Sequence, residues 1–140
     1  MKVLANDGIS KSGILALEKG GFEVITTKVA QEQVANFVNE KNISVVLVRS
    51  ATKVRKDIID ACPGLKIIGR GGVGMDNIDV DYAKSKGIQV INTPASSSES
   101  VAELVFAHLF SGVRFLHDSN RNMPLEGDTN LKNKKKAYAN

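Results

Sequence analysis

The sequence predicts an α/β domain in which helices cover both faces of a parallel, doubly wound β-sheet. Five short apolar runs alternate with four segments of helical periodicity between residues 2 and 91, which is typical of βαβ units. One run, Ser44–Val48, is rich in β-branched residues and has no polar alternation, as expected of a strand buried on both faces. Gly, Pro and Asn residues separate the runs and predict turns.

The predicted strands, in chain order, are Lys2–Ala5, Phe22–Thr26, Ser44–Val48, Leu65–Ile68 and Ile88–Ile91. Four helices are predicted between these strands. The first is capped by Ser10, carries Ile14, Leu15 and Leu17 and ends at Gly20-Gly21, and the second is Gln31–Lys41, with Val34, Phe37 and Val38 on one face. The third is Val54–Cys62, and the fourth is capped by Asp79 and ends at Gly87. Five strands in a chain of this length favour a flavodoxin-like domain with strand order 2-1-3-4-5. Such a domain places its site outside the carboxyl ends of the strands.

A fifth, longer helix is predicted after this domain. Ser96-x-x-Glu99 and Ser100-x-x-Glu103 form overlapping capping-box patterns, and residues 101–116 are apolar on almost every side. Such a helix must be covered on several sides, so we expect self-association or a second domain. We therefore divide the chain into an α/β domain (1–98), an interface helix (99–120) and a polar basic tail or linker (121–140).

Composition excludes several classes of protein. The chain of 140 residues has one cysteine, Cys62, and no apolar leader or long apolar run, so we expect a cytoplasmic protein with no membrane partner. The net charge of +4 comes from lysines 132, 134, 135 and 136, without which 15 basic side chains balance 15 acidic ones. A terminal lysine run of this kind is typical of a solvated tail, so we expect no nucleic-acid partner.

The glycine-rich stretch Gly69–Asp79 has the clearest chemical signature. Its first six residues match G-x-G-x-x-G, the dinucleotide-binding pattern, but Met75–Asp79 is too polar to open the required helix, and the next strand ends in Asn92 instead of an acidic residue. Three interpretations remain: dinucleotide binding, a purely structural turn, and an anion site made of backbone N–H groups. We favour the anion site, because glycines let a ligand approach the backbone closely.

Arg49 and Ser50 end the buried strand on the edge where this loop lies. A guanidinium group presents a planar fork of donors to a carboxylate or phosphate, and Lys53 and Arg70 add positive charge nearby. The alternative is that Arg49 is an ordinary surface residue. Asn92 and Thr93 either belong to the same site or only form the turn before Pro94. His108, His117 and Cys62 lack defensible catalytic partners, and the sequence predicts no metal site.

Four motifs in one order resemble the N-terminal part of the D-isomer-specific 2-hydroxyacid dehydrogenases: VRSATKV, GRGGVGMDNIDV, NTP and SVAEL, within about residues 1–120. The resemblance implies that this segment is the family's substrate-binding domain. Arg49 and Ser50 would then contact the substrate's anionic groups, and Arg70 would line the cleft. The N–H groups of Gly72, Val73 and Gly74 would face the substrate carboxylate, with Val73 also near the nicotinamide of NAD.

The same resemblance implies that residues 1–98 are the substrate-binding domain and that residues 121–140 lead toward a Rossmann domain absent from this chain. The NAD-binding loop and the catalytic residues would lie in that second domain, so no catalytic residue is assigned here. We expect the parent protein to use NAD to oxidise a small anionic substrate, a phosphorylated 2-hydroxy acid, and these 140 residues alone to be inactive. One alternative is reduction of an unphosphorylated substrate, glyoxylate or hydroxypyruvate, by the same family. Another is a non-catalytic flavodoxin-like binding or regulatory module.

Overall fold

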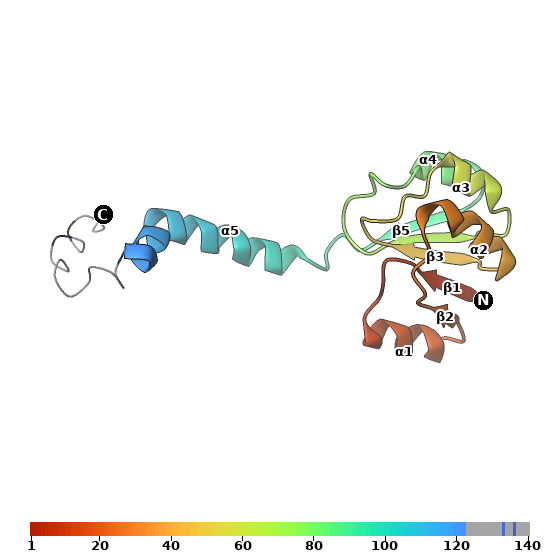
Figure 1. Ribbon diagram of the computed structural model, residues 1–140, viewed down its shortest axis with the longest axis horizontal. Helices are drawn as coiled ribbons and strands as arrows, with labels where there is room; N and C mark the ends of the chain where they lie inside the picture. Colours follow the sequence, from red (N-terminus) through yellow and green to blue (C-terminus); the bar gives the residue numbers. More distant parts are fainter. Residues whose placement is uncertain (123–132, 134–135, 137–140) are drawn as a thin grey trace. The chain divides into compact units, whose positions relative to one another are not determined.

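The computed structural model describes residues 1–122, 133 and 136, so most of the predicted basic tail lies outside the described residues. The chain divides into two compact units, Met1–Ser96 and Ser97–Asn140. The first unit is an α/β domain (Figure 1). Within the described residues, no helix is long and apolar enough to cross a membrane.

A single five-stranded sheet forms the centre of the first unit. Its strands are β1 (Lys2–Ala5), β2 (Glu23–Ile25), β3 (Val45–Val48), β4 (Ile67–Arg70) and β5 (Gln89–Asn92). All neighbours are parallel, in the order β2-β1-β3-β4-β5, which confirms the predicted flavodoxin-like topology. The carboxyl ends of the strands therefore meet at one edge.

Helices lie on both faces of this sheet, as predicted. They are α1 (Lys11–Lys19), a 3-10 turn η1 (Gln31–Gln33) followed by α2 (Val34–Glu40), α3 (Lys56–Ala61) and α4 (Val80–Ser85). Helix α1 lies on one face, and α2, α3 and α4 lie on the other (Figure 1). The Ser10 side chain accepts a hydrogen bond from the Gly13 N–H, which confirms the predicted cap of α1.

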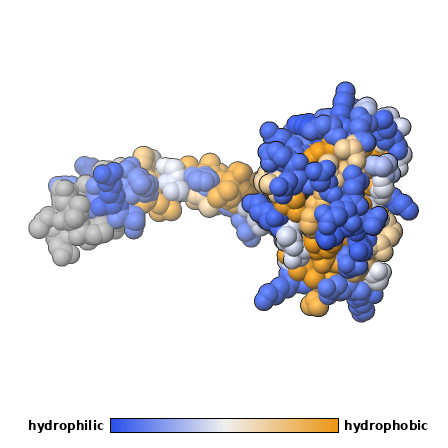
Figure 2. All heavy atoms as spheres, turned by 45° about the vertical axis from the view of Figure 1, so that its right-hand side comes forward, coloured by the Kyte–Doolittle hydropathy of each residue, from blue (hydrophilic) through white to orange (hydrophobic). Residues whose placement is uncertain are grey.

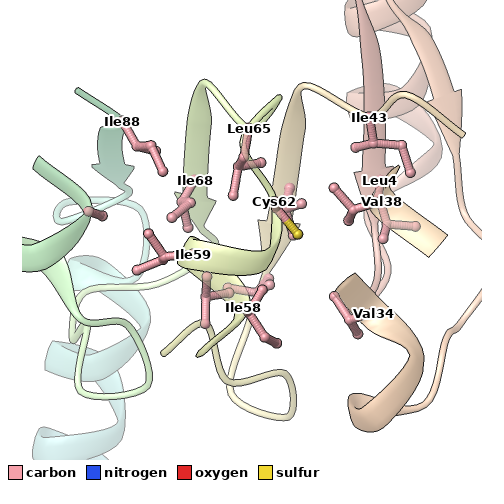
Figure 3. Close-up of a cluster of buried hydrophobic side chains, with 14 of the residues drawn as sticks. Leu4, Val34, Val38, Ile43, Ile58, Ile59, Cys62, Leu65, Ile68 and Ile88 are labelled. Carbon is pink, nitrogen blue, oxygen red and sulfur yellow. The ribbon is translucent and has the colours of Figure 1, made fainter. Parts of the chain in front are cut away.

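The hydrophobic core lies between the sheet and the three-helix layer. Leu4, Val46 and Ile68 point from β1, β3 and β4 toward α2 and α3, and each is at most 1% exposed. Figure 3 shows the resulting cluster, including Cys62 at the end of α3. Burial raises the pKa of the Cys62 thiol, so this group behaves as a small apolar side chain.

Replacing Ile68 with alanine is expected to destabilise this core. The side chain is fully buried, so Ile68→Ala should lower the free energy of unfolding by about 2–5 kcal/mol, from lost burial and the cavity left behind. Urea unfolding followed by circular dichroism measures this change. The matched control is Leu15→Ala in α1, where the side chain is 66% exposed and the expected change is within about 0.5 kcal/mol. Equal losses in the two variants would contradict this description of the core.

Two predicted boundaries were wrong because long-range pairing decides them. Strand β4 ends at Arg70, two residues later than predicted, since Gly69 and Arg70 still pair with Leu47 and Val48. The predicted helix from Val54 begins at Lys56 instead, because Val54 forms an isolated parallel bridge with Ile78. The glycine-rich stretch therefore begins inside a strand and not in a loop.

The predicted caps at two helices were also wrong. Asp79 gives α4 no side-chain cap, because its carboxylate accepts hydrogen bonds from the Arg55 guanidinium and from the N–H of Lys56, the first residue of α3. These bonds, led by the one from Arg55, lower the pKa of Asp79. The long helix has Ser97 as its N-cap residue and no side-chain capping bond, so neither predicted capping box forms.

The described part of the second unit is helical. Helix α5 (Ser98–Val113) has no buried residue, and Figure 2 shows apolar side chains along it. The prediction of a continuous apolar helix to Leu116 was wrong. The helix is interrupted by a turn at Arg114-Phe115, where Phe115 has a φ of 50°, and helical structure resumes over 116–122. The poor helix formers Ser111 and Gly112 precede this break. Apolar side chains more than half exposed are Val101, Leu104, Val105, Phe106, Leu109, Phe110, Val113 and Leu116.

Candidate anion-binding site

A pocket of about 710 Å³ lies at the carboxyl edge of the sheet. Its apolar floor includes Leu47, Gly69 and Ile91, which are direct cross-strand neighbours on β3, β4 and β5. Gly69 has no side chain in this row, and a Cβ there would stand 2.6 Å from Cδ2 of Leu47. The remaining lining residues are Asp7, Gly8, Ile9, Ser10, Val48, Arg49, Arg70, Gly71, Asn92 and Thr93.

Arg49 is the first residue after β3 and reaches the pocket from its exposed side. Its side chain passes over Gly71, where an added Cβ would lie 3.5 Å from Cγ of Arg49. Among the described residues, its guanidinium group has no acidic partner within ion-pair distance. The charge of Arg49 is therefore available to a ligand in the pocket.

Arg70 ends β4 and lines the same pocket, opposite Val48 on β3 and Asn92 on β5. Its Nε atom is buried and has no hydrogen-bond acceptor in the described part of the chain. An unpaired buried donor on a charged group costs free energy, which an anion in the pocket would recover. Arg49 and Arg70 thus bring two guanidinium groups to one cavity, and neither group has an acidic partner among the described residues.

The loop after β4 is tied to the end of β5. Thr93 N–H donates to the Gly72 carbonyl, and the Asn92 side-chain amide donates to the Val73 carbonyl at 2.7 Å. These bonds turn the carbonyls of Gly72 and Val73 toward β5. Gly72 N–H bonds the Arg70 carbonyl, whereas the N–H groups of Val73 and Gly74 have no acceptor among the described residues.

This loop does not have the geometry of a dinucleotide site. After Gly74 the chain forms turns, and no helix begins until Val80, as the sequence indicated. A pyrophosphate group therefore meets no helix N-terminus directly after the glycines, and the loop does not fit the phosphates of NAD. The match of this loop to the G-x-G-x-x-G pattern is therefore no evidence that it binds a dinucleotide.

The structure brings together only some of the predicted site residues. Arg49 and Arg70 line one pocket, as do Asn92 and Thr93, whose role the sequence left open. Ser50, Gly72, Val73 and Gly74 lie in the loops that follow β3 and β4 and do not line the cavity itself. No group of three potential metal ligands occurs in the described residues.

Asp7 also lines the pocket, and no motif in the sequence pointed to it. Its carboxylate accepts hydrogen bonds from Arg49 N–H at 2.7 Å, Thr52 N–H at 3.0 Å and the Thr52 hydroxyl at 2.6 Å. Burial raises the pKa of Asp7, but hydrogen bonds from Thr52, Arg49 and Ala51 outweigh burial and hold it below its usual value. Asp7 therefore remains ionised, and its carboxylate oxygens accept hydrogen bonds from Arg49 and Thr52 of the same chain.

Gly72 is expected to be essential for the position of Arg70. Its φ of 151° is unfavourable for other residues, and a Cβ there would overlap the Arg70 guanidinium. Gly72→Ala should therefore displace Arg70 from the pocket and cost about 1–3 kcal/mol of stability, the usual range for backbone strain. A crystal structure and urea unfolding of the variant check both effects.

Gly64→Ala is the matched control for this substitution, because nothing lies within 4 Å of a Cβ at Gly64 and its φ is not positive. This control should leave Arg70 and the stability unchanged. If Arg70 kept its position in Gly72→Ala, the position of the guanidinium group would not depend on the absence of a Cβ at Gly72.

The fold and pocket define a flavodoxin-like α/β domain with a basic site at the carboxyl edge of its sheet. Residues 3–134 match the family described as D-isomer specific 2-hydroxyacid dehydrogenase, catalytic domain. The chain belongs to this family of oxidoreductases.

Individual relatives carry two different names. The chain is 42% identical over 116 residues to a hydroxypyruvate reductase of Thermotoga maritima, covering 82% of this chain and 37% of that protein. It is 41% identical over 114 residues to a D-3-phosphoglycerate dehydrogenase of Methanocaldococcus jannaschii, covering 81% and 21%. The chain thus spans well under half the length of these relatives.

A solved structure agrees with the sequence comparisons. The NAD⁺-bound 3-phosphoglycerate dehydrogenase of Entamoeba histolytica superimposes with a TM-score of 0.66 at 33% identity, covering 81% of this chain and 39% of that one. That structure is a member of the family with its cofactor bound.

Proposed function

We propose that this chain supplies the substrate-binding part of an NAD-dependent D-3-phosphoglycerate dehydrogenase. That enzyme oxidises 3-phosphoglycerate to 3-phosphohydroxypyruvate, the first step of phosphorylated serine biosynthesis. The observation that carries the proposal is that Arg49 and Arg70 line one pocket and that neither guanidinium group has an acidic partner among the described residues. 3-Phosphoglycerate carries two anionic groups, a carboxylate and a phosphate, which two such forks of donors suit.

The roles of the remaining predicted residues follow from this proposal. Ser50 and the N–H groups of Val73 and Gly74, which lie in the loops beside the cavity and have no backbone acceptor among the described residues, would complete the donor set at its rim. Gly72 would hold the loop in place. Val73 is 52% exposed and is proposed to contact the nicotinamide of NAD. NAD itself would supply the hydride acceptor, bound mainly by another domain of the full-length protein.

A hydroxypyruvate reductase is the second candidate, favoured by the 42% identity to the Thermotoga maritima protein. The apolar floor of the pocket does not exclude an unphosphorylated substrate. Kinetics of the full-length gene product decide between the two. A kcat/KM for phosphohydroxypyruvate well above that for hydroxypyruvate supports the dehydrogenase, and the reverse order supports the reductase.

The chain of 140 residues is proposed to bind substrate without catalysing its oxidation. Residues 1–98 would form the substrate-binding domain, 99–120 the interface helix, and 121–140 the link to a nucleotide-binding domain. Measurable NADH production by the purified 140-residue chain would contradict this division of labour. If the full-length gene product lacked dehydrogenase activity entirely, a non-catalytic binding module would replace the proposal.

The proposal also covers self-association of the chain and its place in the cell. The exposed apolar side chains of α5 would pack against a second copy of the same helix, since such a surface is unfavourable in water. The oxidoreductase is proposed to work in the cytoplasm, where a single buried cysteine remains reduced.

A further inference from the structure

The turn Arg49–Thr52, which carries the first arginine of the pocket, is held from two sides. From the turn after β1, the Asp7 carboxylate accepts hydrogen bonds from the N–H groups of Arg49 and Thr52 and from the Thr52 hydroxyl. From the segment between β4 and α4, the Asn77 side-chain amide donates to the carbonyls of Arg49 at 2.9 Å and Thr52 at 2.7 Å. Side chains thus bind both the N–H and the carbonyl of Arg49.

The residues that hold the turn are themselves fixed. Thr52 is 3% exposed and Asn77 is 6% exposed, in contrast to Arg49, which is exposed. Next to Asp7, the Asn6 side chain donates to the Thr52 hydroxyl oxygen at 2.8 Å and to the Val29 carbonyl at 3.1 Å, and accepts from Val29 N–H at 2.8 Å. The ends of β1 and β3 and the loop before η1 therefore form one polar network.

We propose that Asp7 is a positioning residue of the anion site: by holding the N–H groups of the Arg49–Thr52 turn, its carboxylate sets the direction in which the Arg49 side chain enters the pocket. This inference rests on the proposed function only in naming the ligand. Asp7 makes no contact with the ligand's charge in this role. It acts on the site through the backbone of Arg49, while Asn77 holds the same residue from the other side.

An Asp7→Asn substitution tests this role. Asparagine keeps the shape of the side chain but carries no charge and has one acceptor oxygen in place of two. The bonds to the turn therefore weaken, and at least one of the three donors loses its acceptor. In the chain without ligand, the ¹H–¹⁵N heteronuclear NOE of the Arg49 side-chain Nε should fall clearly below its wild-type value, while that of Arg70 stays unchanged. Asp57→Asn, an exposed aspartate on α3, is the matched control and should change neither arginine.

Binding of 3-phosphoglycerate supplies the second readout. Asp7→Asn should raise the Kd about tenfold in the wild-type background, as expected if the displaced Arg49 side chain loses one charge-assisted hydrogen bond to the ligand. In an Arg49→Ala background it should raise the Kd by less than about twofold, because the two residues act as one unit. Equal effects in both backgrounds would mean that Asp7 acts on the fold and not through Arg49, which would overturn the inference.

Thr52 provides an independent pair of variants should Asp7→Asn not fold. Thr52→Val removes the hydroxyl that donates to Asp7, and Thr52→Ser retains it. The inference expects lower Arg49 order in the valine variant and near-wild-type order in the serine variant. Unchanged Arg49 order in a folded Thr52→Val or Asp7→Asn chain would overturn it. If the wild-type chain bound no 3-phosphoglycerate, the proposed ligand would be wrong, and the ligand-free NOE would still decide the role of Asp7.

Discussion

Arg49→Ala should weaken binding of 3-phosphoglycerate to the chain by about 10- to 100-fold, because a hydrogen bond to a charged group contributes about 1.5–3 kcal/mol. Its guanidinium has no acidic partner among the described residues, so its removal leaves no buried carboxylate unpaired. The stability of the fold should therefore remain close to wild type. Isothermal titration and urea unfolding measure the two quantities separately.

Further variants sharpen this prediction. Arg49→Lys should recover only part of the affinity, since an ammonium group cannot form the planar, two-pronged contact. Combining Arg49→Ala with Arg70→Ala should abolish measurable binding. Arg121→Ala is the matched control, because it removes the same charge from the second unit and should leave the affinity unchanged. Wild-type affinity in Arg49→Ala would remove Arg49 from the proposed site.

The second large effect is expected at α5. Val105 and Leu109 lie one turn apart on the helix and are 59% and 52% exposed. If α5 packs against a second copy, the combined Val105→Glu and Leu109→Glu variant should weaken association by at least about 100-fold, since an unpaired charge buried at an interface costs several kcal/mol. Sedimentation velocity over a range of concentrations measures the change.

The control for α5 places the same charges on another side of the helix. Ala107→Glu with Ser111→Glu has the same spacing but lies about 160° around the helix from the first pair, on the side of Glu103 and Arg114. That variant should associate like the wild type. A wild-type chain that remained monomeric at high concentration would contradict self-association through α5 altogether.

The sequence predicted the strands well because their signal is local. Continuous β-branched runs such as Val45–Val48, separated by turn residues, are sufficient to indicate buried parallel strands and hence the topology. Gly69 and Arg70 were not predicted as strand residues, since neither residue type favours a strand. They are strand residues because β3 and β5 pair with them on either side.

The two arginines of the site could be predicted from the sequence, but the residues that hold them could not. Arg49 directly follows one predicted strand and Arg70 lies two residues beyond another, so the topology brings both to one edge of the sheet. Asp7 and its partner Thr52 are 45 positions apart, and Asp79 bonds Lys56 across 23 positions. Short polar side chains give the same turn or cap signal whether their partners are local or distant, so these contacts become visible only in three dimensions.

The most direct test is a titration of the ¹⁵N-labelled chain with 3-phosphoglycerate, followed by NMR. Saturable shifts are expected for the amide signals of Arg49, Ser50 and Arg70 and of the glycine loop 71–74. Signals around Tyr82 and Lys86, a polar cluster on α4 and the turn after it, should not move. The absence of saturable shifts, or shifts confined to that cluster, would contradict the claim that this pocket is the substrate-anion site.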